Sequence, residues 1–295
     1  MDNIPKYPIY IPSKGRADVC FTAQFFIEDG VDFKIVVEPS QEADYLKFFD
    51  KKYLLILPKD NQGLIYSRLF IRQHSAKNGF QRHWQFDDNI RLIRRLQKGK
   101  RIRCNARIAI KAIEDFTDRY ENIGISGFNY TMFVMNDTKK PLMTNVHVYS
   151  AFLLNNSIPY KWRLQWNDDV DLCLQVLSGG LCTVSFNAFM VDKIATMKVK
   201  GGCTTDYLDK EKDTRLKGAK LLQANWPEMV RVKWKYGRWH FEIKNAWRDF
   251  TTPLIRRKDI DWEALKKPNN YGMKLTELKK VKSKSLKKML KEDRK

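Results

Sequence analysis

The sequence predicts an α/β fold built on a largely parallel sheet, and three observations support this prediction. Short apolar runs alternate with helical patterns through the first third of the chain, as in repeated strand–helix–strand units. The chain has 295 residues, of which 43% are hydrophobic, so it can bury a sizeable core as one large domain or two small ones. Polar residues follow several of the apolar runs, where such a sheet places its ligand.

Each strand predicted in the first third is a short, mostly apolar run that stops at a proline or at charged residues. Each predicted helix shows helical spacing, as with Phe21, Phe25 and Phe26 in the first. The strands are expected at 8–12, 33–37, 53–57 and 83–86, and the helices at 19–29, 41–50 and 64–76. A nucleotide bound to a parallel sheet lies at the carboxyl ends of the strands. The polar residues at those ends are Lys14, Arg16, Glu38, Lys59, Asp60, Asp87 and Asp88.

The rest of the chain mixes helices and strands and ends in a basic stretch. The helices are expected at 104–118 and 166–177, and the strands at 123–130, 145–153, 182–190 and 230–243. Residues 266–295 contain twelve basic and three acidic residues, so they contribute +9 to the net charge of +21. Such a block is typical of a solvated helix or tail, and it also fits an appendage that grips a polyanion. The predicted domains are 1–255 and a basic extension, 256–295.

The net charge of +21, from 55 basic and 34 acidic residues, predicts a polyanionic partner. Nucleic acid is the first candidate and an anionic membrane surface the second. No apolar run approaches the roughly 20 residues of a membrane-spanning helix, and no secretory signal is visible. The five scattered cysteines indicate a reducing cytoplasm, without a zinc site or a disulfide framework. The lack of a Walker A loop and of G-x-G-x-x-G argues against P-loop NTPases and ordinary dinucleotide enzymes.

Two adjacent carboxylates, Asp87 and Asp88, follow the strand 83–86, and Asn89 follows them. Neighbouring acids repel each other and need a cation or a strong hydrogen-bond donor to remain ionised together. A divalent metal, Mn²⁺ or Mg²⁺, supplies that charge through oxygen ligands and in turn holds a diphosphate. The same pattern also fits two acids that cap the N-terminus of a helix.

A second acidic cluster, Asp168, Asp169 and Asp171, opens the helix at 166–177. The helix dipole stabilises negative charge at this end, which explains the cluster without any function. In the functional interpretation, one of these acids is a general base that faces the hydroxyl group of an acceptor. Asp171 lies two residues past Asp169, about 200° further around the helix, and is expected to point elsewhere.

Basic residues dominate the stretch 90–113, which contains no acid and begins just after the Asp87–Asp88 pair. Uncompensated charges beside a candidate active site are expected to grip the phosphates of a nucleic-acid acceptor. The predicted DNA contacts in this stretch are Arg91, Arg94, Arg95, Lys98, Arg101 and Arg103.

A later stretch, 230–250, interleaves basic residues with aromatic rings. Stacking rings beside positive charges suit unpaired or flipped bases, and a two-faced strand with its rings in the core explains the pattern equally well. The predicted DNA contacts here are Lys235, Arg238 and Trp239. His240 fits either a core histidine or a late ligand of a metal or phosphate.

Together these motifs resemble glycosyltransferases of the GT-A fold, a Rossmann-type mixed sheet flanked by helices. The chain has I-P-S-K-G-R after its first strand, V-V-E-P after its second, F-D-D-N in the place of the metal-binding D-x-D, and N-D-D-V-D-L in the place of the base-bearing motif. With Gly201-Gly202-Cys203-Thr204, it looks most like the phage TET-associated glycosyltransferases over about residues 7–250. It departs from them in having D-D-N for D-x-D and Asp168-Asp169 for the usual Glu-Asp.

The resemblance implies a metal-dependent, inverting glycosyltransferase that moves a sugar from a nucleotide sugar, a UDP-sugar, onto the hydroxymethyl group of 5-hydroxymethylcytosine in phage DNA. It implies a donor half at 1–90, an acceptor half at 91–255, an Mn²⁺ or Mg²⁺ cofactor and the cytoplasm of an infected bacterium. Asp169, with Asp168 as its alternative, is the implied catalytic base. The implied donor-binding residues are Pro12, Lys14, Arg16, Glu38, Gly63, Arg68 and Asp87, and the implied metal ligands are Asp88, Asp87 and His240.

Two other classes of function fit the same residues. A metal-dependent nuclease or nucleotidyltransferase acting on DNA would use Asp87, Asp88, Asp168 and Asp169 as ligands of two metal ions. A DNA-binding protein without enzymatic activity would keep the basic stretches and lose nothing when Asp87 is replaced.

Overall fold

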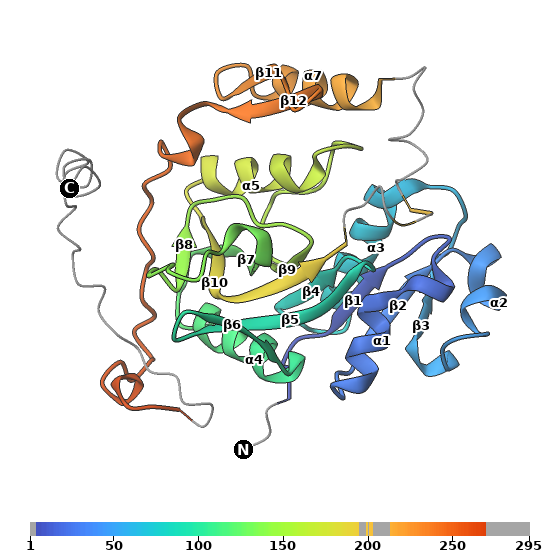
Figure 1. Ribbon diagram of the computed structural model, residues 1–295, viewed down its shortest axis with the longest axis horizontal. Coiled ribbons are helices and arrows are strands. Elements are labelled where there is room, and N and C mark those ends of the chain that lie inside the picture. The colour runs from blue at the N-terminus through green and yellow to red at the C-terminus, as the bar shows by residue number, and fades with distance from the viewer. Residues whose placement is uncertain (1–3, 195–198, 200, 203–212, 270–295) are drawn as a thin grey trace, which may run out of the picture. The chain divides into compact units, whose positions relative to one another are not determined.

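The computed structural model describes residues 4–194, 199, 201–202 and 213–269 (Figure 1). The chain divides into two units, Asp2–Arg257 and Lys258–Lys295, the latter together with Met1. The described part of the second unit includes the short 3₁₀ helix Ala264–Lys266. Most of the predicted basic tail, at 270–295, lies outside the described residues, as do Cys203 and Thr204 of the glycine motif.

The first four strands of the main unit lie side by side in the order β3-β2-β1-β4, and the pairings among these four are parallel. These strands are β1 (Ile9–Pro12), β2 (Lys34–Val37), β3 (Leu54–Ile56) and β4 (Arg82–Phe86), and the helices between them are α1 (Phe21–Glu28), α2 (Glu42–Tyr45) and α3 (Gly63–Lys77). The predicted helix at 41–50 is reduced to the single turn of α2. Leu46 and Phe48 are exposed there, so a longer helix would gain little from packing.

The second half of the sheet is mixed, and it completes a ten-stranded sheet in the order β3-β2-β1-β4-β9-β7-β10-β5-β6 with β8 beside β10. Its strands are β5 (Ile90–Gln97), β6 (Lys100–Cys104), β7 (Ile123–Tyr130), β8 (Leu142–Thr144), β9 (Ala151–Asn155) and β10 (Cys182–Lys193). β9 is antiparallel to β4 and β7, whereas β10 is parallel to β7. A mixed sheet flanked by helices confirms the predicted fold class.

Several elements differ from the prediction. The basic stretch at 90–113 holds the β5–β6 hairpin, which turns at Lys98 and Gly99 with φ of 47° and 74°, and most of α4 (Ala106–Thr117). The predicted strand at 145–153 is extended and paired only from Ala151, as β9. The stretch at 230–243 is a hairpin of two strands, β11 (Val230–Lys235) and β12 (Arg238–Ile243), and α7 (Thr214–Asn225) was not predicted.

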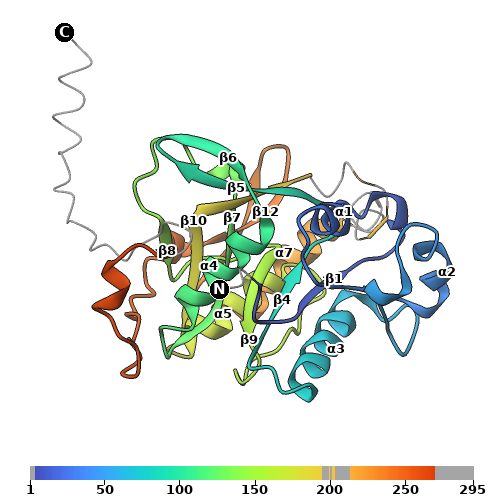
Figure 2. The ribbon, with the colours of Figure 1, turned by 90° about the horizontal axis from the view of Figure 1, so that it is seen from below.

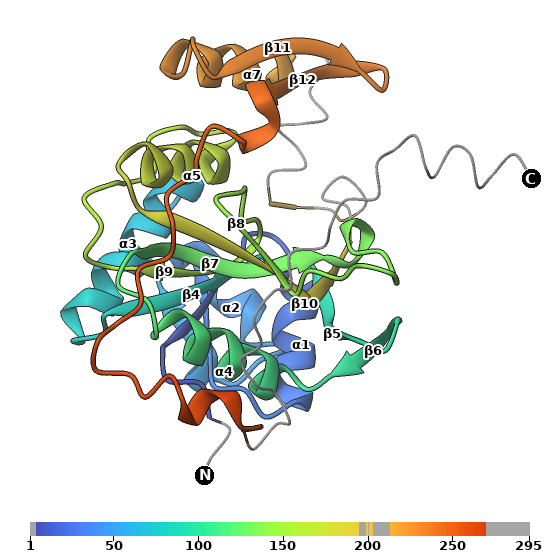
Figure 3. The same ribbon diagram turned by 90° about the vertical axis from the view of Figure 1, so that its left-hand side faces the viewer.

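Helices cover both faces of the sheet, with α5 (Asp168–Ser178) on one face and α1 and α4 on the other (Figures 1 and 3). Side chains alternate between these faces along β4. Trp84 donates to Glu114 of α4 at 2.9 Å, whereas Gln85 accepts from Arg68 of α3 at 3.0 Å. Past the strand end, the contacts place the two acids on different sides: Asp87 meets Lys193 and the charge of Arg68 of α3, whereas Asp88 meets Arg16 and its backbone carbonyl accepts from the Thr22 N–H of α1.

A further layer packs on the outer side of α5, where α7 and the β11–β12 hairpin lie (Figure 1). Its small core joins Val170 and Leu174 of α5 to Leu222 of α7 and to Val230 and Ile243 of the hairpin. The β5–β6 hairpin lies elsewhere, beyond β10 at one edge of the sheet (Figure 2). Each of the two stretches predicted to bind DNA therefore forms a hairpin of its own.

Asp171 joins this outer layer to α5. Its carboxylate is fully buried, pairs with Arg163 at 2.9 Å, and accepts from Trp226 Nε1 at 2.7 Å and from Gln175 at 2.9 Å. Neither Asp168 nor Asp169 shares these partners. The acid expected to point elsewhere thus has a structural role.

Replacing Asp171 with Asn should lower the free energy of unfolding by about 2–3 kcal/mol, because buried donors lose their charged acceptor. Asp44→Asn is the matched control. It removes an exposed acid whose pair with Lys47 is solvated, and should change stability by less than about 0.5 kcal/mol. Urea unfolding midpoints measure both variants, and equal midpoints would show that the Asp171 contacts stabilise nothing.

Candidate active site

The loop after β1 holds Lys14 against the ends of β2 and β3. Its ammonium pairs with Glu38 at 2.8 Å and donates to Asn61 Oδ1 at 2.8 Å. The Asn61 N–H donates in turn to Glu38 at 3.0 Å. A cavity of about 360 Å³ opens beside this loop and reaches α2. Two further predicted donor residues lie at nearby element ends, Pro12 at the end of β1 and Gly63 at the start of α3.

Arg16 of the same loop forms a buried ion pair with Asp88, with 2.6 Å between Nη1 and Oδ1 and side chains only 6% and 5% exposed. The other Asp88 oxygen accepts from Ser13 Oγ at 2.7 Å. Burial raises the pKa of Asp88, although Arg16 and Ser13 oppose that rise. Arg16 also donates to the Gly201 carbonyl at 2.9 Å, and a Cβ on Gly201 would lie 2.4 Å from the Gly15 carbonyl oxygen. Only glycine allows this close approach.

Asp87 lies across the sheet from Asp88 and has a different cation. The Lys193 ammonium, on the last residue of β10, lies 2.6 Å from Asp87 Oδ2 and 2.7 Å from Ser150 Oγ. Burial acts to raise the pKa of Asp87, but the charges of Lys193 and Arg68 outweigh it and hold the pKa below its usual value. Asp87 therefore remains ionised at neutral pH.

Arg68 links α3 to the start of α5. Its Nε lies 2.7 Å from Asp168 Oδ2, its Nη1 donates to Gln85, and its guanidinium lies 5.3 Å from the Phe152 ring centre. Burial raises the pKa of Asp168 to about 6, although the charge of Arg68 acts in the opposite direction. Arg68 was predicted to bind the donor, and here it holds one of the two predicted catalytic acids.

Asp169 is paired with a histidine. His147 Nε2 lies 3.0 Å from Asp169 Oδ2, and the Val170 N–H donates to Oδ1 at 2.9 Å. The His147 ring packs against Tyr149 at 4.1 Å and stacks on Trp247 at 5.9 Å between ring centres. Burial acts to raise the pKa of Asp169, but His147 outweighs it and the pKa falls to about 2. The two neighbouring acids thus hold their protons very differently, as acid and base pairs in active sites do.

The two acidic motifs form one electrostatic cluster. The pKa of Asp168, raised chiefly by burial, is raised further by the charge of Asp87. Burial lowers the pKa of Lys193, yet Asp87 and, to a smaller extent, Asp169 raise it overall. Interactions of this kind weaken with distance, so the end of β4, the start of α5 and the end of β10 lie close enough for their charges to act on one another.

The predicted metal ligands do not come together as a metal site. Within residues 4–194, 199, 201–202 and 213–269, no three His, Cys, Asp or Glu side chains are grouped as ligands. Asp87 and Asp88 lie on opposite faces of the sheet, and each already has a cationic partner, Lys193 or Arg16. These residues do not fit the divalent ion that the resemblance implies.

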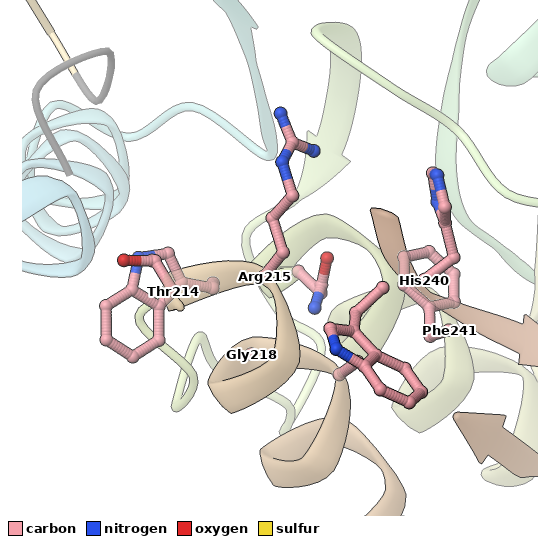
Figure 4. Close-up of a pocket in the computed structure, with 9 residues that line it drawn as sticks. Thr214, Arg215, Gly218, His240 and Phe241 are labelled. Carbon is pink, nitrogen blue, oxygen red and sulfur yellow. The ribbon is translucent and has the colours of Figure 1, made fainter. Parts of the chain in front are cut away.

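His240, the third predicted ligand, lies on β12 at a pocket of about 120 Å³ between α7 and the hairpin. Figure 4 shows it next to Phe241, with Arg215 of α7 in the same pocket. Its Nε2 accepts from Arg238 Nε at 2.7 Å. Burial lowers the pKa of His240, and the positive charges of Arg238 and Arg215 lower it further. The same positive charges would repel a divalent cation in this pocket.

The first group of predicted DNA contacts lies along the β5–β6 hairpin. Arg94 pairs with Asp192 at 2.6 Å, and Arg103 pairs with Asp29 at 3.0 Å. Arg95 is half-buried. The exposed members are Arg91, Lys98, Arg101 and Arg103. Acids of the fold therefore pair with part of the hairpin's positive charge, and the rest is exposed along its edge.

The second group lies on the β11–β12 hairpin. Trp239 is half-buried and packs edge-on against Trp234, with ring centres 5.3 Å apart. The most exposed rings are Tyr236, at 89%, and Trp234, at 59%. Lys235 pairs with Glu242 at 2.6 Å. For stacking, Tyr236 and Trp234 are better placed than the predicted Trp239.

Two residues of the candidate site were not among the predicted site residues. His147 follows Val146 in what reads as a strand, and Lys193 ends a long apolar strand. Neither belongs to a motif. His147 lies 22 positions before Asp169 and Lys193 lies 106 positions after Asp87, so only the folded chain shows the pairs.

Comparisons with known proteins identify one family and a number of similar solved structures. The model of the family described as TET-Associated Glycosyltransferase matches residues 7–202. No curated protein matches the chain. A putative nucleotide-diphospho-sugar transferase from Desulfovibrio desulfuricans G20 is similar at 7% identity over 62% of this chain and 80% of that one, with a TM-score of 0.37. The inositol-1-phosphate CTP transferase from T. maritima is similar at 11% identity over 68% and 93%, with a TM-score of 0.39.

The described ranges contain no helix long and apolar enough to cross a membrane.

Replacing Arg16 with Met should destabilise the protein by about 3–5 kcal/mol, because it leaves the buried Asp88 carboxylate without its cation. Adding Asp88→Asn to this variant should recover part of the loss, since a neutral amide needs no counter-charge. Denaturant unfolding of the two single variants and the double variant gives the coupling energy. Additive losses would contradict the pairing.

Proposed function

The chain belongs to the TET-associated glycosyltransferase family, and we propose that it transfers a sugar from a UDP-sugar to the hydroxymethyl group of 5-hydroxymethylcytosine in phage DNA, in the cytoplasm of an infected bacterium. Membership of the family supports glycosyl transfer from a nucleotide-sugar donor. The single observation that carries the residue assignment is the pair Asp168–Asp169, which faces Asp87 and Lys193 in one charged cluster.

On the donor side, the proposal places the nucleotide beside the loop after β1. Gly15 of this loop lines the cavity, and Lys14, next to it in the chain, pairs with Glu38, whose carboxylate is offered to the ribose or base. Pro12, at the end of β1, and Gly63, at the start of α3, lie at the borders of this region. Arg16 acts as a positioning residue, because its guanidinium is held by Asp88.

The reacting groups are proposed to meet in the acidic cluster. Arg68 holds Asp168, and His147 holds Asp169 with one oxygen directed by the Val170 amide. The acceptor hydroxyl oxygen forms a bond to C1 of the sugar, and its proton passes to Asp169. The bond from C1 to the diphosphate breaks, and its electron pair leaves with the nucleoside diphosphate. One displacement of this kind inverts the anomeric centre.

The acceptor side of the proposal rests on charge and on exposed rings. The net charge of +21 favours a polyanion, and the β5–β6 hairpin exposes Arg91 and Lys98. Tyr236 and Trp234 offer faces for a base that has left its stack. These basic and aromatic side chains bind the DNA, whereas the acidic cluster carries out the transfer.

The divalent metal implied by the resemblance has no place in this mechanism. Asp87 and Asp88 are already paired with Lys193 and Arg16, and His240 accepts from Arg238, so the proposed transfer uses no metal ion. The alternative of a two-metal nuclease meets the same difficulty, since Asp168 is paired with Arg68 and Asp169 lies 3.0 Å from His147.

Asp169→Asn should lower kcat by about 10²- to 10⁴-fold while leaving the affinities for donor and DNA nearly unchanged, because the amide has no site for the proton. His147→Gln should lower kcat less, since it removes only the group that orients Asp169. Mass analysis of nucleosides from DNA incubated with a panel of nucleotide sugars measures transfer.

Asp168→Asn is the matched control, one residue away. If that variant is inactive while Asp169→Asn works normally, Asp168 is the base. Metal-dependent nicking of plasmid DNA without sugar transfer would instead identify a nuclease.

Lys98→Asn should weaken DNA binding and reduce the slope of log affinity against log salt by about 0.9, the loss of one phosphate contact. Asn tolerates the left-handed backbone at this turn, where φ is 47°, so the hairpin is retained. Lys77→Ala removes the same charge from the far end of α3 and should leave the slope unchanged. Fluorescence anisotropy with labelled DNA measures both, and equal slopes would remove the hairpin from the DNA surface.

A further inference from the structure

We propose that Lys193 neutralises the diphosphate of the donor in place of a divalent metal, so that sugar transfer by this chain requires no metal ion. The proposal rests on the function proposed above and names the residue that meets the leaving group. It departs from the metal expected from the D-D-N motif.

The Lys193 ammonium is fixed in the site by two oxygen partners. Asp87 Oδ2 lies 2.6 Å away and Ser150 Oγ 2.7 Å, and Ser150 Oγ is itself 2.6 Å from the Tyr130 hydroxyl. The side chain is 16% exposed. A buried ammonium is strongly unfavourable without a paired acid, so Asp87 holds the lysine rather than leaving it to move with solvent.

The backbone also directs Lys193 inward. The register of β10 against β5 shifts between Asp192 and Lys193, as at a bulge. The extra residue at this shift is Arg91 on β5, so β10 keeps the alternation that sends the side chains of Asp192 and Lys193 to opposite faces. Asp192 pairs with Arg94 of β5, whereas Lys193 reaches Asp87 at the end of β4.

The carboxylates of the D-D-N motif are already neutralised on both faces of the sheet. Asp88 uses one oxygen for Arg16 and the other for Ser13. Asp87 has Lys193. A divalent ion bound to either carboxylate would face an ammonium or a guanidinium at close range, and like charges at that distance oppose binding.

Lys193 retains the means to bind an anion. An ammonium has three N–H donors, and among the described residues two are directed at Asp87 and Ser150. One donor is left for a phosphate oxygen. The carboxylates of Asp87 and Asp168 would repel a diphosphate brought near them, and Lys193 and Arg68, which are paired with these two acids, are cations that can offset its charge. A fixed cation of this kind stabilises charge that grows on a leaving group.

The first test needs no variant. Sugar transfer by the full chain is measured after treatment with EDTA, and again with Mn²⁺ or Mg²⁺ added. We expect equal rates in the three conditions. Loss of transfer in EDTA that either metal restores would overturn the proposal.

The second test replaces Lys193 with Met, which keeps the length of the side chain and removes its charge. In EDTA, kcat should fall by about 10²-fold, and Lys193→Arg should retain more activity than Lys193→Met. Lys77→Met is the surface control and should match the unmodified protein. A Lys193→Met variant that folds and works normally would overturn the proposal. Circular dichroism checks the fold, and Lys193→Gln serves if the methionine variant unfolds.

The third measurement separates this proposal from the proposed function. Calorimetry gives the affinity for UDP in EDTA, independently of any sugar or acceptor. Lys193→Met should weaken UDP binding at least tenfold, and Mn²⁺ should not tighten binding to the unmodified protein. If no nucleotide sugar is transferred to DNA but UDP binds in this manner, the proposed function fails and the role of Lys193 stands. UDP binding that appears only with a metal rejects that role.

Discussion

The site is organised by carboxylates that are shielded from water, because each of them needs a partner that offsets its negative charge. A buried carboxylate without a partner is strongly destabilising, and two neighbouring acids that share one cation would compete for it. The chain meets this requirement with three cations and a histidine from four different segments. Arg16 pairs with Asp88, Lys193 with Asp87 and Arg68 with Asp168, and His147 lies beside Asp169. The same pairs therefore hold together the β1 loop, β4, α3, α5 and β10.

The accuracy of the strands predicted from the sequence differs between the two halves of the structure. Strands β1 to β3 are mostly apolar runs, and all four of the first strands were found within a residue or two, because prolines or charged residues end each of them. β5 and β6 were missed, since arginine and lysine alternate there with Ile and Leu, and charge was the more visible feature. The hairpin turn at Tyr236 and Gly237 was missed for a similar reason, within a stretch that reads as one strand.

The candidate site was predictable where its residues sit in local motifs. Asp87 and Asp168 could be found because acids directly follow a strand or open a helix. The different environments of Asp87 and Asp88 could not be predicted, because they depend on Lys193 and Arg16 from other segments. The partners Lys193 and His147 carry no local signal, because their contacts depend on where β10 and the chain before β9 pass in space.

The first turn of α5 belongs to two environments. Asp168 and Asp169 face the charged cluster, while Asp171, three residues after the first of them, anchors Trp226 and Arg163 beneath the outer layer. Any movement of α7 and its hairpin would therefore act on a helix that also positions Asp168 and Asp169. The position of α5 between the sheet and the hairpin couples these two parts of the fold.

The basic edge strand also affects how copies of the protein meet one another. The sheet ends at β3 and β6, and exposed strand edges invite pairing with another chain. β3 has only three residues, and β6 exposes Lys100, Arg101 and Arg103. Repulsion between such edges extends over about 10 Å in 0.1 M salt but only about 3 Å in 1 M salt. The chain is therefore protected against self-association in dilute buffer and loses that protection in concentrated salt, or wherever a bound polyanion covers the edge.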